Sequence, residues 1–192
     1  MPRIPYVYPA PGESQIADKI RERRKDGKLI ELDGILLNSP SIAEGYSALL
    51  KAVRTDNSLP EDVRELMILR VAALNSAAYE WLAHEPLARS AGLTSTQLEV
   101  VRDVSTVPAT HQTTKGLLTP VQEAALIYAD HMTRNIKVPD DIFRKLRENL
   151  QDDRKVLEAT ATIAGYNMVS RILVALDVAD KANLDVPLVD TN

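Results

Sequence analysis

The sequence predicts an all-α protein, a multi-helix bundle that forms one domain over residues 1–192. Three observations lead to this prediction. Runs of β-branched residues with period-two alternation are missing, so no sheet is expected. Helix start signals recur along the chain, including three Ser/Thr-x-x-Glu/Gln capping motifs. No internal repeat, low-complexity stretch or change of composition divides the chain.

The first elements follow from proline and capping signals. Residues 1–13 contain four prolines, which interrupt regular helices, so they are expected to form an extended N-terminal arm. The segment from Ser14 to Lys25 is expected to be a short amphipathic helix, and residues 27–37 a partly helical connector. Ser39 and Pro40 are suited to the N-cap and the first helical position, so they are expected to start the next helix.

The later elements are separated by similar signals. Capping boxes open three more helices, at Ser58, Thr94 and Thr119. Two further helices are expected at residues 139–150 and 152–180, followed by a short C-terminal tail over residues 181–192. Residues 107–118 are expected to be a polar loop, which is long enough for a lid or an interface segment.

Composition excludes several classes of function. The net charge of −4 and the pI near 5.4 argue against nucleic acid as a partner, because phosphate binding needs a basic patch. No apolar run approaches the roughly 20 residues that cross a bilayer, and the N-terminus lacks the apolar core of a signal peptide. A cytoplasmic protein without a membrane partner is therefore expected. The chain has no cysteine, so it can form no disulfide and perform no thiol chemistry.

Four polar residues on two apolar helices are the catalytic candidates: Glu65, Tyr79, Glu80 and His84. Glu80 and His84 are four residues apart, so they share a helix face. Glu65 lies in the apolar run RELMILRVAAL, where burial would raise the pKa of its carboxyl toward neutrality. A carboxylic acid beside an imidazole can transfer protons. The alternative is that Glu65 forms a salt bridge with a neighbour such as Arg64 and is solvated.

A second group of polar residues is expected to bind the substrate. Tyr166, Asn167 and Arg171 lie in the long apolar segment near the C-terminus, where Asn167 and Arg171 share a face. A buried arginine requires an anion, which could be a substrate carboxylate or an internal carboxylate at Glu65, Glu80 or Glu158. Arg70, in the middle of the Glu65 helix, is the second candidate for holding a carboxylate.

Neither a metal nor a cofactor is expected. A metal site needs three or more converging ligands, whereas Glu80 and His84 supply two. His111 and His131 lie in polar surroundings and are expected to be solvated. The glycines show no phosphate-binding pattern, which argues against a nucleotide cofactor.

The pattern E-x13-Y-E-W-x2-H, followed by A-x2-A-G-L-T, resembles the carboxymuconolactone decarboxylase and alkylhydroperoxidase D-like superfamily. The segment IAGYNMVSRILVAL resembles the closing helix of that family, and the likeness extends from about Ile4 to Val178. The peroxidase branch carries a C-x2-C pair, whose positions are Ala77 and Glu80 here. The chain therefore resembles a cysteine-free branch, in which thiol peroxidase activity is excluded.

The resemblance implies a helical bundle that assembles as a homo-oligomer (trimer, hexamer or dimer), with its site near a subunit interface. Helices that are apolar on more than one face agree with such an assembly. The resemblance also implies a cofactor-free lyase that decarboxylates a small unsaturated lactone acid or cyclic enol. One alternative is an isomerase or cyclase that acts on a larger biosynthetic metabolite. Another is a catalytically inactive oligomeric protein that serves in ligand binding or as a scaffold.

The residues receive roles under this interpretation. His84 would donate or accept the proton, and Glu65 would tune the pKa of His84. Tyr79 and Glu80 would polarise the substrate, while Arg171 or Arg70 would hold its carboxylate. We expect all four catalytic candidates to reach one cavity, with a water-mediated contact between Glu65 and His84.

Overall fold

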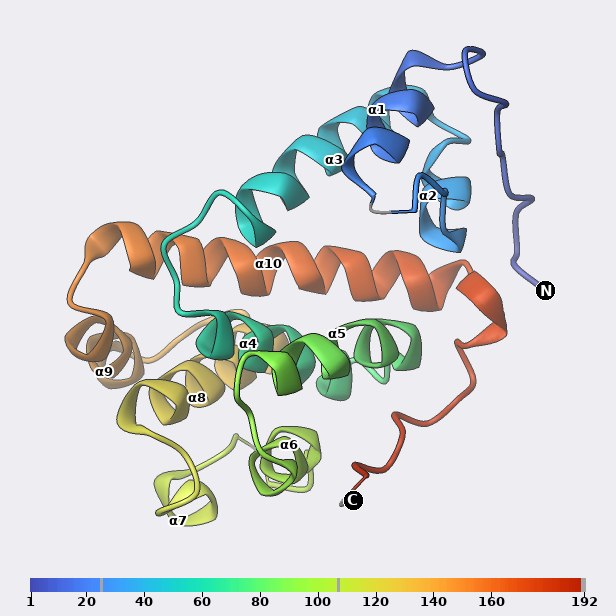
Figure 1. The fold of residues 1–192 in the computed structure, drawn as a ribbon. Coiled ribbons are helices and arrows are strands. Elements are labelled where there is room, and N and C mark those ends of the chain that lie inside the picture. The colour runs from blue at the N-terminus through green and yellow to red at the C-terminus, as the bar shows by residue number, and fades with distance from the viewer. Residues whose placement is uncertain (25, 107, 191–192) are drawn as a thin grey trace.

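The computed structural model describes residues 1–24, 26–106 and 108–190, and within these ranges it contains helices and no β-strand (Figure 1). This agrees with the all-α fold class predicted from the sequence. The helices are α1 (Gln15–Arg23), α2 (Glu31–Leu36), α3 (Pro40–Arg54), α4 (Glu61–Leu74), α5 (Ala78–Ser90), α6 (Ser95–Arg102), α7 (His111–Thr114), α8 (Pro120–Asn135), α9 (Asp140–Leu150), α10 (Asp153–Ala175) and the 3₁₀ helix η1 (Val178–Asp180).

The long helix α10 crosses the molecule, with α1 to α3 on one side and α4 to α9 on the other (Figure 1). Helix α4 forms the centre of the core, where it packs against α5, α8 and α10. Every residue from Glu65 to Ala73 is buried. A helix that is apolar on nearly all sides must be covered all round, so the rest of the fold encloses α4.

Several predicted caps are present. The side chains of Ser14 and Asp152 cap α1 and α10, and the capping boxes that begin at Thr94 and Thr119 open α6 and α8. The predicted capping box at Ser58 is wrong. Its hydroxyl donates instead to the Glu158 carboxylate at 2.6 Å. Helix α4 begins at Glu61 with Pro60 at its N-cap position, so Ser58 lies two residues before the cap.

Three predicted boundaries differ from the structure. The first helix ends at Arg23, and Lys25 lies outside the described residues. The loop expected over residues 107–118 contains the short helix α7, although residue 107 itself is not described. The last α-helix ends at Ala175 instead of near Asp180. Residues 177, 179 and 180 have positive φ angles, which a continuous right-handed helix does not allow.

The N-terminal arm fixes the position of α2. The Val7 amide donates to the Gly34 carbonyl at 2.9 Å, and the ring of Tyr8 covers Gly34. A Cβ atom at this glycine would lie 2.7 Å from the Tyr8 ring, so only glycine permits the approach. Arg3 ties the same arm to the end of α10 through the Leu176 carbonyl. The arm therefore links α2 to the C-terminal end of α10.

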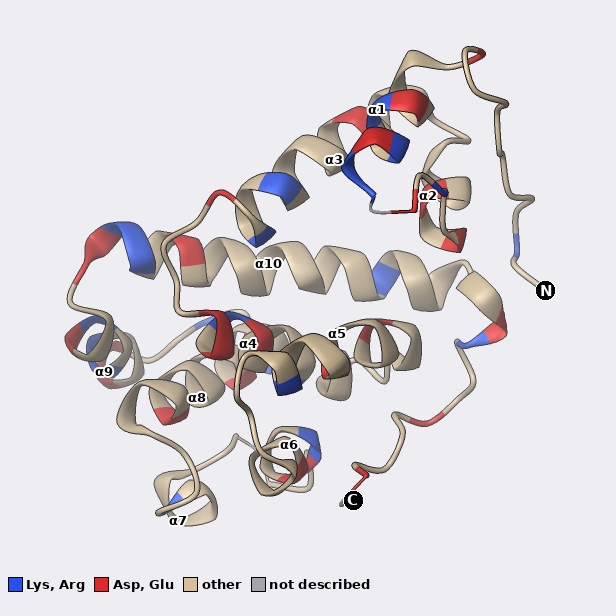
Figure 2. Cartoon of the chain, in the orientation of Figure 1, with Lys and Arg blue, Asp and Glu red and all other residues tan. Residues whose placement is uncertain are grey.

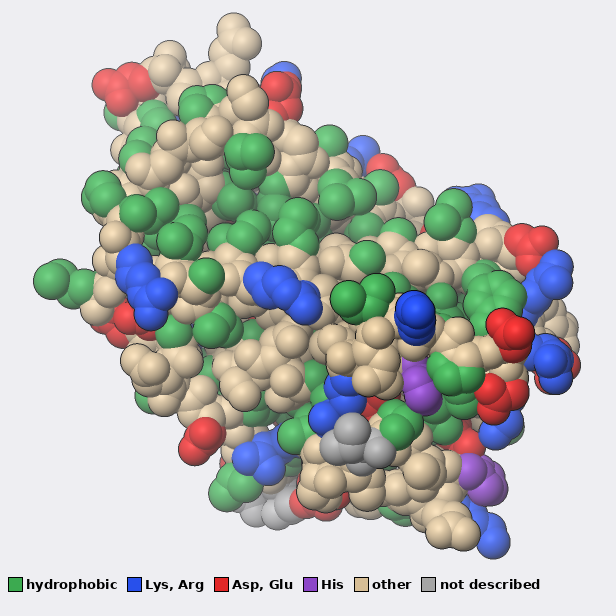
Figure 3. Space-filling view, turned by 180° about the vertical axis from the view of Figure 1, so that it is seen from behind, with side chains coloured by type: hydrophobic (Ala, Val, Ile, Leu, Met, Phe, Trp, Pro, Cys, Tyr) green, Lys and Arg blue, Asp and Glu red, His purple; other side chains and the backbone are tan. Residues whose placement is uncertain are grey.

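Charged residues gather on α1, α2 and the end of α3, whereas the middle of α10 carries few (Figure 2). Seen from behind, hydrophobic side chains gather over the half of the molecule that contains α1 to α3 (Figure 3). Among the described residues, no helix combines the length and apolar character that a membrane span requires.

Candidate active site

Three helices each contribute one residue to a network in which His84 lies between two hydrogen-bond partners. Glu65 comes from α4, His84 from α5 and Tyr166 from α10. The Glu65 Oε2 atom lies 2.7 Å from His84 Nδ1, and the Tyr166 hydroxyl lies 3.1 Å from His84 Nε2. The two rings meet edge to face, with centroids 5.0 Å apart. Both imidazole nitrogens are therefore engaged by protein side chains in a buried network.

The surroundings of this network indicate its protonation. Burial lowers the pKa of His84, and the charges of Arg54 and Arg64 lower it further, against an opposing effect of Glu65. Burial also raises the pKa of Tyr166, so its hydroxyl keeps the proton. A neutral His84 can then donate from Nδ1 to Glu65 and accept at Nε2 from Tyr166. The arrangement is a relay in which each group orients the next.

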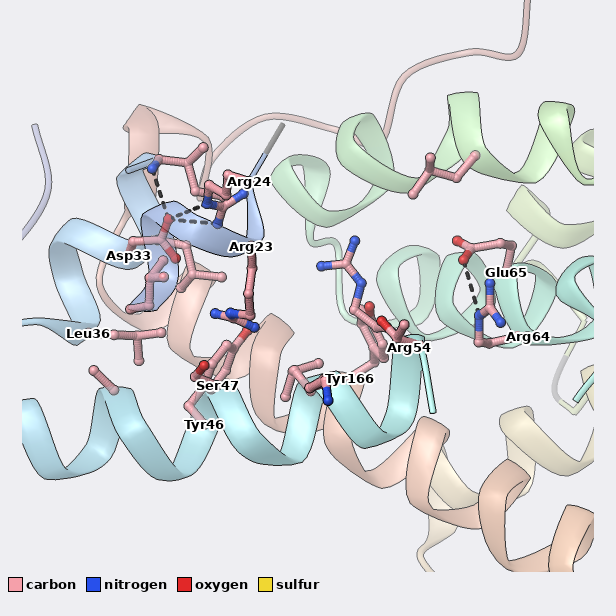
Figure 4. Close-up of a pocket in the computed structure, with 18 of the residues that line it drawn as sticks. Arg23, Arg24, Asp33, Leu36, Tyr46, Ser47, Arg54, Arg64, Glu65 and Tyr166 are labelled. Carbon is pink, nitrogen blue, oxygen red and sulfur yellow. Dashed lines mark hydrogen bonds and ion pairs between the residues drawn. The ribbon is translucent and has the colours of Figure 1, made fainter. Parts of the chain in front are cut away.

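A cavity of about 800 Å³ lies against this network, between α1 to α3 on one side and α4, α5 and α10 on the other (Figure 4). Glu65 and Tyr166 are among the residues that line it, whereas His84 is behind them. Figure 4 shows Tyr166 and Glu65 within this region, together with arginines from α1, α3 and α4. Representative lining residues are Ile20, Leu36, Tyr46, Arg54, Glu65 and Tyr166.

Glu80 lies one turn before His84 and is 2% exposed. Among the described residues, neither of its carboxyl oxygens has a hydrogen-bond partner. Burial raises its pKa well above the ordinary value, so the group stays protonated when a solvated glutamate would ionise. Glu80 thus adds a neutral acid to the surroundings of the network.

The structure brings together part of the predicted catalytic set. Glu65 and His84 meet, and the expected water-mediated contact is a direct hydrogen bond instead. Glu65 also lies 3.4 Å from Arg64, so the predicted alternative of a neighbouring salt bridge is present alongside the histidine contact, although the carboxyl is buried. Tyr79 does not belong to the network, because its hydroxyl donates to Glu31 on α2 at 3.1 Å.

Arg70 has a structural role in the core instead of the predicted role in substrate binding. Its side chain is fully buried and forms a bidentate ion pair with Asp130, with N–O distances of 2.7 and 3.0 Å. It also donates to the carbonyls of Val101 and Asp103. Asp130 in turn accepts from the Ala109 amide. All of these partners belong to the protein, so Arg70 has no free donor face for a ligand.

Arg171 and Asn167 lie away from the Glu65–His84 network. Arg171 is exposed and donates to the carbonyl and side-chain oxygens of Asn167, so none of the predicted internal carboxylates pairs with it. Asn167 itself donates to Thr133. Arg171 lines a separate cavity of about 300 Å³ together with Ser170. Of the predicted substrate-binding residues, only Tyr166 reaches the larger cavity.

Tyr46 and Arg54 are among the residues of this cavity that sequence reasoning missed. Both line it from α3. They are eight residues apart, which places them on one face of a helix, and this spacing was the available signal. Among the described residues, no group of three or more metal-ligating side chains occurs.

Comparison with known proteins adds a family and a fold. Residues 40–130 match the model of the carboxymuconolactone decarboxylase family. A crystal structure of an uncharacterised peroxidase-related protein from Silicibacter has a TM-score of 0.74 at 18% identity, and covers 95% of this chain and 94% of that chain. An alkylhydroperoxidase AhpD core structure from Ralstonia eutropha, also described as peroxidase-related, has a TM-score of 0.69 at 22% identity, covering 91% and 92%.

A third structure, of a protein of unknown function from Agrobacterium tumefaciens, has a TM-score of 0.63 at 23% identity and covers 74% of this chain and 92% of that chain. These identities establish a shared fold alone. No curated protein matches the chain. The family match contains Glu65, Glu80 and His84, whereas Tyr166 lies beyond it. Residues 40–130 therefore resemble the carboxymuconolactone decarboxylase family, and the resemblance predicted from the sequence is confirmed.

Proposed function

We propose that the protein is a cofactor-free lyase that decarboxylates a small unsaturated lactone acid or cyclic enol by acid–base catalysis. The observation that carries this proposal is the Glu65–His84–Tyr166 network, which ends at the wall of a cavity. Positioned acid–base groups typically accelerate reactions by about 10²–10⁴-fold. The network supplies a proton donor, a base and an orienting carboxylate without any further group.

The proposed reaction needs one proton. Loss of carbon dioxide leaves the bonding electron pair on carbon, from which it passes into a conjugated carbonyl as an enolate. The carbon then takes a proton and the carbonyl re-forms, so the acid becomes the protonated product and carbon dioxide. The Tyr166 hydroxyl lies at the cavity wall and can deliver this proton to carbon. The proton that replaces it comes from solvent and passes to the tyrosine oxygen through Nε2 of His84, which then returns to its neutral form. Glu65 orients the imidazole.

The names of the similar structures suggest peroxidase chemistry, but this chain cannot perform its thiol form. A cysteine-pair peroxidase requires a thiolate, and the chain contains no cysteine. The positions that correspond to the two cysteines are Ala77 and Glu80. A carboxyl group at the second position can hold or give a proton but cannot form a disulfide.

A second candidate is an isomerase or cyclase that acts on a larger metabolite through the same proton transfers. The size of the cavity favours it. A volume of about 800 Å³ lies in the upper part of the range that accommodates drug-sized ligands, which is more than a small lactone requires.

We also propose that the protein forms a homo-oligomer. Large hydrophobic side chains are exposed on two helices beside the cavity, at Ile42 and Leu49 on α3 and at Leu82 and Leu87 on α5. Ile42 and Leu49 are seven residues apart and share one face of α3, and exposed apolar side chains on one face are typical of protein interfaces. Light scattering after size exclusion tests this proposal, and a monomer at micromolar concentration would contradict it.

Proton transfer can be tested before the natural substrate is known. Unsaturated lactone acids and cyclic enol acids are incubated with the protein in D₂O, and NMR follows carbon dioxide loss and deuterium uptake at carbon. Decarboxylation supports the lyase, whereas deuterium uptake without decarboxylation supports the isomerase or cyclase. Ligand-induced stabilisation without either signal would indicate the inactive binding protein instead.

Variants show whether the network carries the activity. His84→Gln and Tyr166→Phe should each lower turnover at least about a hundredfold. The double variant should lose little more than either single one, because groups that act as one unit are strongly non-additive. If both single variants retain the wild-type rate, the network is not the site of catalysis.

A further inference from the structure

Most basic residues of the large cavity pair with a carboxylate, but Arg54 does not do so among the described residues. Arg24 pairs with Asp33 at 2.6 Å, Lys51 with Asp56 at 3.0 Å, and Arg64 contacts Glu65 at 3.4 Å. Among the described residues, Arg54 has neither a hydrogen-bond partner nor an ion-pair partner, although it lines the same cavity. Its guanidinium therefore offers its donors to whatever enters.

The position of Arg54 places its charge next to the Tyr166–His84 network. Arg54 ends α3, and Figure 4 shows its guanidinium projecting into the region between Arg23 on one side and Glu65 on the other. Burial raises the pKa of Tyr166, and the positive charge of Arg54 lowers it. Burial lowers the pKa of His84, and the charge of Arg54 lowers it further. Electrostatic effects on both groups indicate that Arg54 lies within interaction range of the network. Arg23, the other cavity arginine that has no partner among the described residues, has no such effect on them.

We propose that Arg54 is the anchor for a substrate carboxylate, one that the substrate keeps throughout the reaction. This deepens the proposed function and rests on it for the kinetic role, and it replaces Arg70 and Arg171 in the predicted task of binding a carboxylate. A guanidinium presents paired donors that match the two oxygens of a carboxylate.

Arg54 should bind the carboxylate that the substrate retains, not the one that leaves as carbon dioxide, for an electrostatic reason. Negative charge leaves the departing carboxylate as the carbon–carbon bond breaks, so a cation that held it would stabilise the ground state more than the transition state. A cation that holds a second carboxylate orients the substrate without opposing the reaction. Arg54 is thereby a specificity-determining residue, whose loss should raise KM more than it lowers kcat.

Tyr46 supports the placement of this anchor. It is half-buried, lines the cavity from the same helix, and its pKa, which burial raises, is lowered in turn by the Arg54 charge. Its hydroxyl remains protonated and is able to donate a hydrogen bond. An acidic group held by Arg54 would therefore meet a neutral hydrogen-bond donor nearby.

The test compares two small probes, benzoate and benzamide, which differ in charge but scarcely in shape. Their dissociation constants are measured by NMR titration on the wild type, Arg54→Met, Arg54→Lys and Lys51→Met. Lys51→Met is the matched control, because Lys51 lines the same cavity one turn earlier but is already paired. Arg54 is exposed and makes no internal hydrogen bond among the described residues, so Arg54→Met should fold normally, which thermal unfolding verifies.

We expect Arg54→Met to weaken benzoate binding by roughly tenfold to a hundredfold, the range for a lost charge-assisted hydrogen bond. Lys51→Met should stay within about threefold, Arg54→Lys should retain part of the affinity, and benzamide should be unaffected throughout. Equal effects of Arg54→Met and Lys51→Met would overturn the assignment, as would a wild type that prefers benzamide. If deuterium uptake is absent while the benzoate result holds, the proposed function fails and the anchor remains.

Discussion

Glu80→Met should make the protein more stable, which is unusual for a substitution in a core. Both oxygens of Glu80 are buried and have no hydrogen-bond partner among the described residues. A buried polar group without a partner destabilises the folded state by about 1–3 kcal/mol. Methionine fills a similar volume without polar oxygens, so the unfolding free energy of the variant should exceed that of the wild type by about that amount. For a chain of this size, about 2–4 °C per kcal/mol implies a higher melting temperature by about 2–12 °C.

The pH dependence separates charge from polarity at this position. Because burial raises the pKa of Glu80, the folded carboxyl stays protonated after the unfolded one ionises above its ordinary value of 4.5. Stability contributed by the protonated group is therefore complete below that value and is lost as pH rises through the folded pKa. Glu80→Gln, which cannot ionise, should match the wild type near pH 4 and exceed it at pH 8. Urea unfolding at both values measures this.

Two results would refute this reasoning. Destabilisation of Glu80→Met by more than about 1 kcal/mol would mean that the carboxyl has a structural partner. An unchanged difference between Glu80→Gln and the wild type from pH 4 to pH 8 would mean that its pKa is not raised. If Glu80→Met is stabilised and also loses turnover, Glu80 serves function at the expense of stability.

Three other outcomes are expected. Because the pKa of His84 is lowered from 6.5, the acidic limb of the pH–rate profile should lie below pH 6.5, and steady-state kinetics that place it above would contradict a neutral histidine. Asp130→Asn leaves Arg70 buried without an anion and should lower the unfolding free energy by about 3–5 kcal/mol in urea, and a loss below 1 kcal/mol would exclude a stabilising pair. Tyr79→Phe should keep turnover within threefold, because the hydroxyl contacts Glu31, and a tenfold loss would return Tyr79 to the site.

Local signals predicted much of the fold and half of the site. The capping residues Thr94 and Thr119 mark their helices because caps depend on neighbours three residues away. Adjacent residues point in different directions on a helix, which is why Tyr79 contacts α2 while its neighbour Glu80 faces the core. A pattern of helix faces distinguishes these directions only when the position of the packing partner is known.

Pairings over long sequence distances could not be predicted. Arg70 was predicted to hold a substrate carboxylate, whereas it pairs with Asp130, which lies 60 residues later on another helix. Tyr166 approaches His84 across 82 residues, through the packing of α10 against α5. Helical periodicity shows which face of each element is apolar, but it does not show which faces meet.

The occupied nitrogens of His84 restrict what the site can do. A histidine that acted directly on a substrate would need one free nitrogen at the cavity wall, yet Glu65 and Tyr166 engage both. The group that meets the substrate is therefore the Tyr166 hydroxyl, unless that side chain turns away. Tyrosine at such a position can give or take a proton only in step with His84, because its raised pKa makes a lasting phenolate unfavourable. The arrangement thus favours reactions in which a proton moves on or off carbon within one concerted step.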